Sequence, residues 1–590
     1  MTTLSSAVET EVLIVGAGPA GAAAAALLST YGVANIVINK YPGVSTTPRA
    51  HITNQRAMEV LRDLGLEAQA TAAATPQHLM GEHVYATSLA GRELGRLRTW
   101  YTHPHFQAEH DLASPCSICD LPQDQLEPIL VNAAASRGSS VRFNTELLDF
   151  TQDDEGVTAR VKDRLTGAEY RIRSKYMIGA DGGNSQVMKQ LGLPLVGEMG
   201  LGGSINIVFQ ADLTHLAEHR PGDMYWFIQP GAGHDGLGIG VLRMVRPWDR
   251  WIGVWGYDES AGTPELSEED AVSIAHQLIG DDSIPVKVES VSIWAINHVY
   301  ATDNMKGRVF CAGDAVHRHP PMNGLGSNTS IQDSYNLCWK LALVLRGEAS
   351  PALLETYRDE RLPVAEQIVE RAWKSNGYIP SLFQALQLPA APDEHSMAKA
   401  VGELEARTPE GTERRRAFEK AMQSTLIGFN AHGVELNQHY RSGAVLAEGA
   451  TEPTAPRDEE IYYFASAHPG RHLPHVWLTR NQRRVPLFDL CGKGAFTLLT
   501  GPRGEVWREA AAKVAEELGV SIQVHTIGVG CDYEDGYGDY GAICEVAEDG
   551  ALLVRPDHMV AWRAQNSGDD PAARLVEVTG KLLGRAGRES

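Results

Sequence analysis

The chain has 590 residues, of which 43% are hydrophobic and 21% are charged, a composition typical of a soluble globular protein with several domains. Its 52 basic and 74 acidic side chains give a net charge of −22, which disfavours nucleic acid and anionic membranes as partners. No apolar run approaches the ~18–20 residues of a membrane helix, and the polar first ten residues lack a signal-peptide pattern. We therefore expect a cytoplasmic location.

The first structural signal along the chain is an apolar run over residues 11–15, which predicts a strand. The motif Gly16-Ala-Gly18-Pro-Ala-Gly21 follows directly, then an Ala-rich helix and a second strand over residues 35–38. In such a unit the first glycine permits a tight turn, the second lets the backbone approach a pyrophosphate, and the third lets helix pack on strand. The motif predicts a bound dinucleotide; a glycine-rich turn without a ligand is the alternative.

The acidic residue that usually ends the second strand of this unit, and holds the ribose, is absent. Asn39 stands in that place and Lys40 follows it. An amide can still accept a hydrogen bond from a ribose hydroxyl, but the two-point grip of a carboxylate is lost. We expect Asn39 and Lys40 to contact the cofactor with this weaker grip.

The next part of the chain changes character at about residue 200. Residues 1 to about 190 alternate strand and helix signals, and a short apolar strand over 176–180 ends at Asp181. Residues 200–300 are β-rich and aromatic, with glycine and proline turns, which predicts an inserted antiparallel sheet. Most tryptophans there are expected in the core. Trp226, in a Tyr-Trp pair within a strand, is the one expected to line a pocket.

A second cofactor motif occupies residues 307–340. It predicts a buried strand, a turn at Gly313 and Asp314, a loop rich in proline and glycine, and a long helix. Such a helix directs the positive end of its dipole at whatever lies in the loop. Beyond it, residues 327–440 are mainly helical and residues 451–456 resemble a linker. The remainder is expected to form a small α/β domain, with Trp562 in its final turn.

The seven cysteines are an odd and sparse set, and Cys116 and Cys119 form the one CxxC pair. A zinc site needs a second pair, or histidines at ligand spacing, and neither is evident. His317 and His319 stand on either side of an arginine in a proline-bounded loop. We expect free thiols at the CxxC pair, no metal at either place, and no disulfide exchange in the C-terminal domain.

Several short sequence motifs along the chain together indicate a known protein family. They are the glycine motif at 16–21, Ala180-Asp181-Gly182-Gly-Asn-Ser185, Cys311-Ala-Gly313-Asp314, Thr47-Pro-Arg49-Ala-His51 and Gly222-Asp223-Met-Tyr-Trp226. With them the chain resembles the class A FAD-dependent aromatic monooxygenases, the phenol hydroxylases, over essentially its whole length. Within that family it is most similar to members that hydroxylate 2-hydroxybiphenyl, and next to members that hydroxylate 2,4-dichlorophenol.

The resemblance implies an α/β fold of the aromatic hydroxylase type. A Rossmann-like FAD-binding domain would occupy residues 1–195 and 301–380, with an inserted antiparallel substrate-binding sheet over 196–300. A helical connecting region would follow over 381–450, and a thioredoxin-like C-terminal domain without redox cysteines over 451–590. The family also implies a homodimer or homotetramer.

The resemblance assigns the cofactor site residue by residue. Gly16, Gly18 and Gly21 would hold the FAD pyrophosphate. Arg49 and Gln123 would contact FAD, Asp181 belongs to a motif associated with FAD and the nicotinamide cofactor, and Asp314 would bind the ribityl–pyrophosphate region. The residues along the isoalloxazine ring would be Pro320, Asn323, Gly324, Leu325 and Gly326.

The nicotinamide cofactor has no domain of its own, because FAD takes the one GxGxxG unit. NAD(P)H would therefore bind transiently, reduce the flavin and leave. An arginine is often found three residues after the motif serine, but Met188 stands there, and we take Arg243 as its substitute. The missing charge slightly favours NADH, since a 2′-phosphate requires positive charge.

The expected reaction is ortho-hydroxylation of a 2-hydroxybiphenyl-type phenol to a catechol, using NAD(P)H and O2 through a flavin C4a-hydroperoxide. Few phenol molecules are ionised at neutral pH, because their pKa is near ~10. His51 is the expected base, since it follows a segment that contacts FAD and imidazole suits proton acceptance. Simple packing against the cofactor is its alternative. Asp223 is a weaker candidate for orientation or proton relay, and otherwise a surface acid.

Other functions stay open at this point. A chlorophenol needs a smaller pocket than a 2-aryl phenol, and pocket size is a tertiary property. A flavoprotein of the same fold that reduces or dehydrogenates its substrate would show no substrate-dependent oxygen uptake. A non-catalytic flavin- or nucleotide-binding scaffold is disfavoured by the loop over residues 313–326, which suits the lining of a reactive ring.

Overall fold

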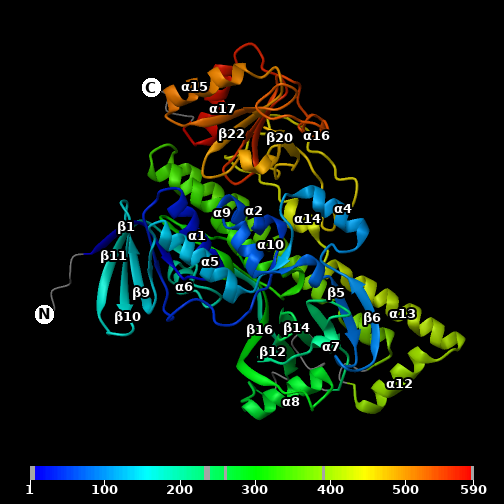
Figure 1. The fold of residues 1–590 in the computed structure, drawn as a ribbon. Helices are drawn as coiled ribbons and strands as arrows, with labels where there is room; N and C mark the ends of the chain where they lie inside the picture. The colour runs from blue at the N-terminus through cyan, green and yellow to red at the C-terminus, as the bar shows by residue number, and fades with distance from the viewer. Residues whose placement is uncertain (1–6, 231–238, 258–261, 389–391, 586–590) are drawn as a thin grey trace.

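The computed structural model describes residues 7–230, 239–257, 262–388 and 392–585. Two eight-stranded sheets and a smaller C-terminal α/β unit organise these residues, and the helices lie between and around them (Figure 1). Within the described ranges, no helix is long and apolar enough to cross a membrane. The same ranges hold no group of three or more His, Cys, Asp or Glu side chains that could bind a metal ion.

The first sheet brings the three cofactor fingerprints together. β1 (Val8–Val15) pairs in parallel with β2 (Asn35–Ile38) and with β11 (Glu169–Gly179), which pairs in parallel with β18 (Val309–Cys311). Carboxyl ends of neighbouring parallel strands lie at one edge of a sheet, so the loops after β1, β11 and β18 meet there. The other strands are β8 (Ser140–Arg142), β9 (Thr145–Gln152), β10 (Val157–Asp163) and β17 (Met305–Lys306).

The strand predicted over 176–180 is the buried end of the longer β11. Its first half, where a strand was also predicted over 170–173, carries charged and polar side chains and pairs with β10. Helix α1 (Pro19–Thr30) buries a run of five alanines and packs against α5 (Gln123–Ser136) and α9 (Gly326–Leu345). The smaller helices of this part are α2 (Gln55–Asp63), α3 (Glu67–Ala73), α4 (Pro104–Ala113) and α6 (Gln186–Leu191).

The second sheet has the order β19-β16-β12-β15-β14-β13-β5-β6. Neighbouring strands are antiparallel except for β13 and β5, which run parallel. Its strands are β5 (Glu82–Ala86), β6 (Glu93–Arg98), β12 (Leu195–Gln210), β13 (Met224–Phe227), β14 (Gly240–Arg246), β15 (Arg250–Tyr257), β16 (Lys287–Ala301) and β19 (His317–Arg318). β5, β6 and β19 enter it from outside residues 196–300; the domain boundaries themselves stay a prediction.

A helix that sequence reasoning missed, α8 (Glu268–Ile279), packs on this sheet (Figure 1). It begins with a capping box between Ser267 and Asp270 and buries Ala271, Ala275 and Leu278. The remaining short elements of this half are α7 (Thr214–Ala217) and a small sheet of β3 (Ile52–Thr53), β4 (Thr75–Pro76) and β7 (Cys119–Asp120).

The C-terminal unit has the predicted thioredoxin-like α/β character. Its sheet order is β23-β22-β24-β25, with β22 and β23 parallel, and α15 packs against α17. The placement of Trp562 in a final turn was wrong: it lies in β25, opposite Leu553 of β24. The bounds are β22 (Phe496–Thr500), β23 (Ile522–Thr526), β24 (Ala551–Val554), β25 (Val560–Ala564), α15 (Val506–Leu518), α16 (Asp539–Ile543) and α17 (Pro571–Leu582).

Helices connect this unit to the rest, and a hairpin precedes its sheet. The connecting helices are α10 (Thr356–Asn376), α11 (Pro380–Ala385), α12 (Glu394–Glu405), α13 (Pro409–Thr425) and α14 (His432–Leu436), and the hairpin is β20 (Trp477–Arg480) with β21 (Arg483–Pro486). All seven cysteines are free thiols, and the CxxC pair is buried.

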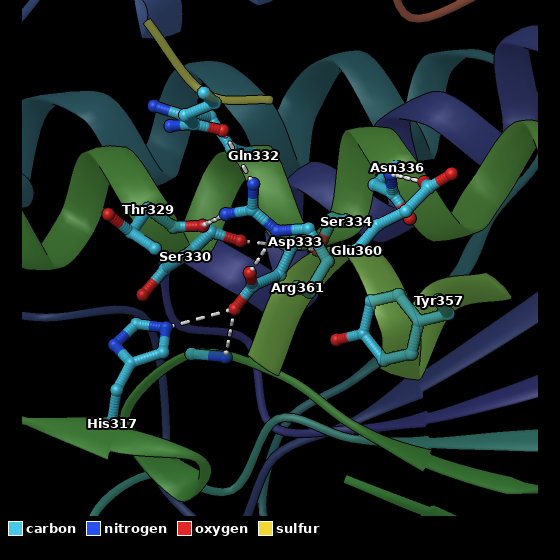
Figure 2. A network of polar contacts seen from close by, with 12 residues as sticks. His317, Thr329, Ser330, Gln332, Asp333, Ser334, Asn336, Tyr357, Glu360 and Arg361 are labelled. Atoms are coloured by element: carbon cyan, nitrogen blue, oxygen red, sulfur yellow. Dashed lines mark hydrogen bonds and ion pairs between the residues drawn. The ribbon is translucent and has the colours of Figure 1, made fainter. Parts of the chain in front are cut away.

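Buried charges join the C-terminal unit to α9 and α10. The Glu360 carboxylate on α10 accepts hydrogen bonds from Asn336 at 2.6 Å and Lys340 at 2.7 Å, both on α9, and Figure 2 shows the contact with Asn336. Arg555, which follows β24, donates to both Glu360 oxygens at 2.6 and 2.8 Å, and to Asp557. Burial alone would raise the pKa of Glu360, but the adjacent Arg555 and Lys340 charges lower it strongly.

We expect Glu360→Gln to destabilise the protein by about 3–5 kcal/mol, because it leaves the buried Arg555 and Lys340 cations short of their counter-ion. Thermal unfolding followed by flavin fluorescence measures the effect. Glu370→Gln is the control: this residue lies on the same helix and pairs with His298, but its side chain is 54% exposed. Equal unfolding temperatures for the two variants would contradict the buried-pair argument.

Candidate active site

Close packing requires glycine at two of the three positions of the motif after β1. Gly16 has a φ of +104°, and a Cβ there would lie 2.1 Å from the carbonyl oxygen of Ala180. A Cβ on Gly21 would lie 2.0 Å from the carbonyl oxygen of Gly16. These two glycines let the turn and α1 pack against β11 and against each other, whatever the ligand.

Gly18 is different, because its missing side chain leaves open space. A Cβ there would meet only Glu127 Oε1, at 3.8 Å. Gly18 also caps the twelve-residue helix α1, with no side-chain hydrogen bond to the first amides. Uncapped amides and the positive end of the helix dipole attract a phosphate. The residues at this turn therefore fit the pyrophosphate of FAD.

Glu127 on α5, which sequence reasoning missed, organises the floor of this region. Its two oxygens accept hydrogen bonds from the Gln123 side chain at 2.5 Å and from the Ser45 backbone amide at 2.6 Å. Burial raises the pKa of Glu127, partly offset by these donors. The i, i+4 spacing of Gln123 and Glu127 on one helix was the available signal. Gln123 is thus placed beside Gly18 through Glu127.

The remaining residues predicted to contact the adenosine part lie nearer the surface. The Asn39 amide is half-buried and donates to the carbonyl oxygen of Gly43 at 2.9 Å. Lys40 is exposed, with its ammonium 5.3 Å from the centre of the Tyr41 ring. Arg49 is also exposed, in the loop before β3. Among the described residues, the side chains of these three make no hydrogen bond to the glycine motif. Their contacts with the cofactor stay predictions.

The two motif aspartates have different surroundings. Both oxygens of Asp181 are used at the start of α6, by the Ser185 hydroxyl at 2.6 Å and the backbone amides of Gln186 and Val187 at 2.7 and 3.1 Å. Asp314 is exposed at the turn after β18, and no described residue donates a hydrogen bond to its side chain. Asp181 therefore shapes its loop, whereas Asp314 presents a carboxylate.

The loop before α9 is held in a conformation of its own. Asn323 has a φ of +64° and its amide donates to the carbonyl oxygen of Ile427 at 2.7 Å. A Cβ on Gly324, whose φ is +59°, would lie 2.9 Å from Ile52. Pro320 is buried, and α9 begins at Gly326 after Leu325 with no side-chain cap. The first turn of α9 therefore has no side-chain cap beside this loop, and the flavin contacts of these residues stay a prediction.

His51, just before β3, is bonded to a carboxylate that sequence reasoning missed. β3 pairs with β7 so that Ile52 lies opposite Asp120, and His51 Nδ1 lies 3.1 Å from Asp120 Oδ1. His51 is 3% exposed, and its Nε2 is buried without a partner among the described residues. Burial and the Arg243 charge lower the pKa of His51, against the opposing effect of Asp120.

Arg243, expected to dock NAD(P)H, points into the interior from β14. Its Nη2 lies 3.1 Å from Asp120 Oδ2 and 3.4 Å from Asp223 Oδ2, and its side chain is 13% exposed. The guanidinium thus bridges two carboxylates. Burial alone would raise the pKa of Asp120, but the hydrogen-bonded His51 and the Arg243 guanidinium lower it. The role of Arg243 in NAD(P)H docking stays a prediction, whereas its two ion pairs are observed in the structure.

Asp223 is fully buried, so its alternative as a surface acid was wrong. Its Oδ1 accepts hydrogen bonds from His83 Nε2 at 2.8 Å and from Trp100 Nε1 at 3.0 Å. The indole of Trp226 in turn donates to His83 Nδ1 at 3.3 Å. A continuous polar path therefore runs from His51 through Asp120, Arg243 and Asp223 to Trp226. We name these residues, with His83 and Trp100, the buried relay.

Aromatic rings surround the far end of the buried relay. Phe429, which follows α13, lies 4.1 Å from His83, 5.6 Å from Trp100 and 5.8 Å from Trp226 between ring centres. Tyr85 stacks on Trp226 at 6.3 Å. Sequence reasoning assigned no role to His83, Trp100 or Phe429, because only the fold brings these residues together. Such a mixture suits a flat, mostly apolar ligand with one polar group.

We expect Gly18→Ala to leave the apoprotein almost as stable as the wild type but to weaken FAD binding at least about tenfold, because its Cβ would occupy space beside uncapped amides. Gly16→Ala should instead destabilise the apoprotein, since its Cβ would overlap Ala180. Flavin-fluorescence titration and unfolding of the apoprotein separate the two effects. Unchanged FAD affinity in Gly18→Ala would contradict a pyrophosphate site at this turn.

The comparisons with known proteins agree with this geometry. A family model described as an FAD binding domain matches residues 9–372, and one described as the C-terminal part of an aromatic-ring hydroxylase matches residues 466–586. The chain is 54% identical to a 2,4-dichlorophenol 6-monooxygenase of Delftia acidovorans (97% of this chain, 99% of that protein). It is 46% identical to a phenol 2-monooxygenase of a Pseudomonas species (97% and 93%).

Among solved structures, the chain is similar to the flavin-dependent monooxygenase PieE in complex with FAD and substrate. The two are 42% identical, with a TM-score of 0.93 over 98% of this chain and 99% of that one. A ternary complex of aklavinone-11 hydroxylase with FAD and aklavinone has a TM-score of 0.80 at 30% identity, covering 98% and 100%. The chain belongs to the FAD-dependent aromatic-ring monooxygenases.

Proposed function

We propose that this enzyme hydroxylates a substituted phenol at the ortho position to give a catechol, consuming NAD(P)H and O2. The observation that supports the proposal is the buried relay with aromatic rings around it. His51 Nε2 lies in the interior with no hydrogen-bond partner among the residues that the structure describes, and Asp120 is bonded to the other ring nitrogen. A phenol offers both the flat ring and the acidic proton that such a site requires.

The tautomer of His51 follows from its partner. A carboxylate only accepts hydrogen bonds, so the proton of the neutral ring lies on Nδ1 and Nε2 is left free to accept one. Burial and the Arg243 charge lower the pKa of His51, which favours the neutral ring in the resting enzyme. Once Nε2 has taken the phenol proton, Asp120 stabilises the imidazolium. The residues thus favour phenolate, whose ortho carbon is richer in electrons than that of the phenol.

FAD would be held at the turn around Gly18, by Asp314, and by the loop before α9. When bound and reduced, it supplies the activated oxygen atom that enters the ring. The uncapped N-terminus of α9 stabilises negative charge in that loop. The reductant would bind only transiently, and NADH is proposed over NADPH because Met188 stands where an arginine is often found.

The substrate is proposed at a finer level than the family shows. Two relatives with 54% and 53% identity are 2,4-dichlorophenol 6-monooxygenases, which supports a chlorophenol. The motifs quoted from the sequence favour a 2-hydroxybiphenyl-type phenol instead. Both belong to the same reaction, and they differ in the volume they require. We also propose a homodimer or homotetramer, which light scattering would measure.

Oxygen uptake by the purified enzyme with FAD and NADH tests the proposal, with 2,4-dichlorophenol and then 2-hydroxybiphenyl added, each with and without catalase. Uptake stimulated by a phenol and insensitive to catalase means coupled hydroxylation, and the faster substrate identifies the class. Uptake that catalase halves makes that phenol an effector only. No stimulation by either phenol would favour the reductase or dehydrogenase alternative and would contradict the proposal.

We expect His51→Ala to retain FAD but to lose most hydroxylation, about 10²-fold or more, because the general base is gone. NADH oxidation should continue as uncoupled peroxide formation. Product analysis against peroxide yield measures the split. His105→Ala removes an exposed histidine and serves as the control. Normal coupling and turnover in His51→Ala would leave the histidine with a packing role only.

The pH dependence should follow the neutral form of His51. Burial and Arg243 lower the pKa of His51 below the usual 6.5. The neutral imidazole therefore persists at pH 7 and is lost only as the pH falls through this lowered pKa. We expect the hydroxylation rate to be flat from pH 7 to 8 and to decline on the acid side. A decline that begins above pH 7 would contradict this electrostatic environment.

A further inference from the structure

Residues Trp100 and Tyr101 form a turn that L-amino acids rarely adopt. Their φ angles are +50° and +63°, and the amide of Thr102 donates to the carbonyl oxygen of Thr99 at 3.1 Å. Two central residues with positive φ are the pattern of a type I′ turn, where glycine and asparagine are usual. Two bulky aromatic residues are strained there, and such strain concentrates at functional sites.

The turn sends its two side chains into different parts of the interior. Both are only 1% exposed. Trp100 donates its indole N–H to Asp223 Oδ1 in the buried relay. The Tyr101 hydroxyl donates to Glu435 Oε1 at 2.7 Å, and its backbone amide donates to the Asn430 side chain at 2.9 Å. The strained conformation is thus fixed by α14 and its preceding loop on one side and by the relay on the other.

The Trp100 hydrogen bond determines how Asp223 divides its two oxygens. Oδ1 accepts the hydrogen bonds from His83 and Trp100, and Oδ2 is left to Arg243 at 3.4 Å. The same Arg243 nitrogen lies closer to Asp120, at 3.1 Å. Because two donors already stabilise Asp223, it attracts the Arg243 guanidinium less strongly than Asp120 does. The guanidinium therefore stays beside Asp120 and His51.

We propose that the Trp100–Tyr101 turn is a positioning element that keeps Arg243 on Asp120, and so sets the protonation of His51 through the carboxylate of Asp223. The groups that face His51 are Asp120, Arg243 and Asp223. Without the indole N–H, Asp223 would draw Arg243 away from Asp120. His51 would then lose a repelling positive charge and feel more of the Asp120 negative charge, so it would hold a proton more tightly.

The inference rests on the proposed function, and the test is built to separate the two. Trp100→Phe removes the indole N–H and keeps an aromatic ring. Trp507→Phe is the matched control, because Trp507 is equally buried and donates one N–H bond, to the Asp549 carbonyl oxygen at 2.9 Å, in the C-terminal unit. Tyr101→Phe breaks the bond to Glu435 and tests the turn without touching the relay.

The measurement is the pH profile of kcat/KM for 2,4-dichlorophenol hydroxylation, together with the absorbance of bound phenolate in the oxidised enzyme. We expect Trp100→Phe to move the acid limb of this profile to higher pH by about half to one pH unit. Relative to wild type, its kcat/KM should be about three- to tenfold lower at pH 6 than at pH 8. Tyr101→Phe should shift the limb in the same direction by less, and Trp507→Phe should not shift it.

A Trp100→Phe profile that coincides with that of Trp507→Phe, with a wild type that hydroxylates the phenol, would overturn the positioning role and leave the proposed function standing. A wild type without phenol-stimulated, catalase-insensitive oxygen uptake would fail the proposed function, and bound-phenolate absorbance then decides the turn alone. If Trp100→Phe does not fold, the Tyr101→Phe profile decides: an unshifted limb rejects the proposal.

Discussion

The buried carboxylate of Asp333 fixes the loop on which the cofactor site depends. From α9 it accepts the backbone N–H of Gly313 and the His317 Nε2–H, both at 3.0 Å, and the Arg361 guanidinium pairs with its other oxygen at 2.8 Å (Figure 2). An unpaired carboxylate at this depth is expensive, so the three donors must meet there. The turn after β18 and the helix that follows it consequently take one relative position.

The cofactor loop and the buried relay are linked through β3. Ile52 contacts Gly324 in the loop before α9, and the neighbouring His51 is bonded to Asp120 through the pairing of β3 with β7. Arg243 and Asp223 come from the second sheet instead. Because the Arg243–Asp120 ion pair joins the second sheet to the small sheet of β3, β4 and β7, the packing of these two sheets determines the charges near His51. A change in that packing would alter the proton affinity of His51, because Arg243 and Asp120 act on it in opposite directions.

The C-terminal unit contributes charge to the interior and no redox pair. Arg555 reaches Glu360 on α10, which lies next in sequence to Arg361, the partner of Asp333. The thioredoxin-like unit is therefore joined by buried ion pairs to α9 and α10, the two helices next to the cofactor loop. Its cysteines are free thiols, and burial raises the pKa of Cys491 and Cys544, which opposes thiolate chemistry.

The sequence by itself determined the local elements and the cofactor class. The glycine motif, the strands at 35–38 and 551–554 and helix α15 follow from φ requirements and hydrophobic periodicity, which act over a few residues. Only the tertiary structure decided which residues join the buried relay. The bond from His51 to Asp120 spans 69 residues, and those from Trp100 and His83 to Asp223 span 123 and 140. No local pattern encodes such pairings, because burial and charge select them only after the sheets have packed together.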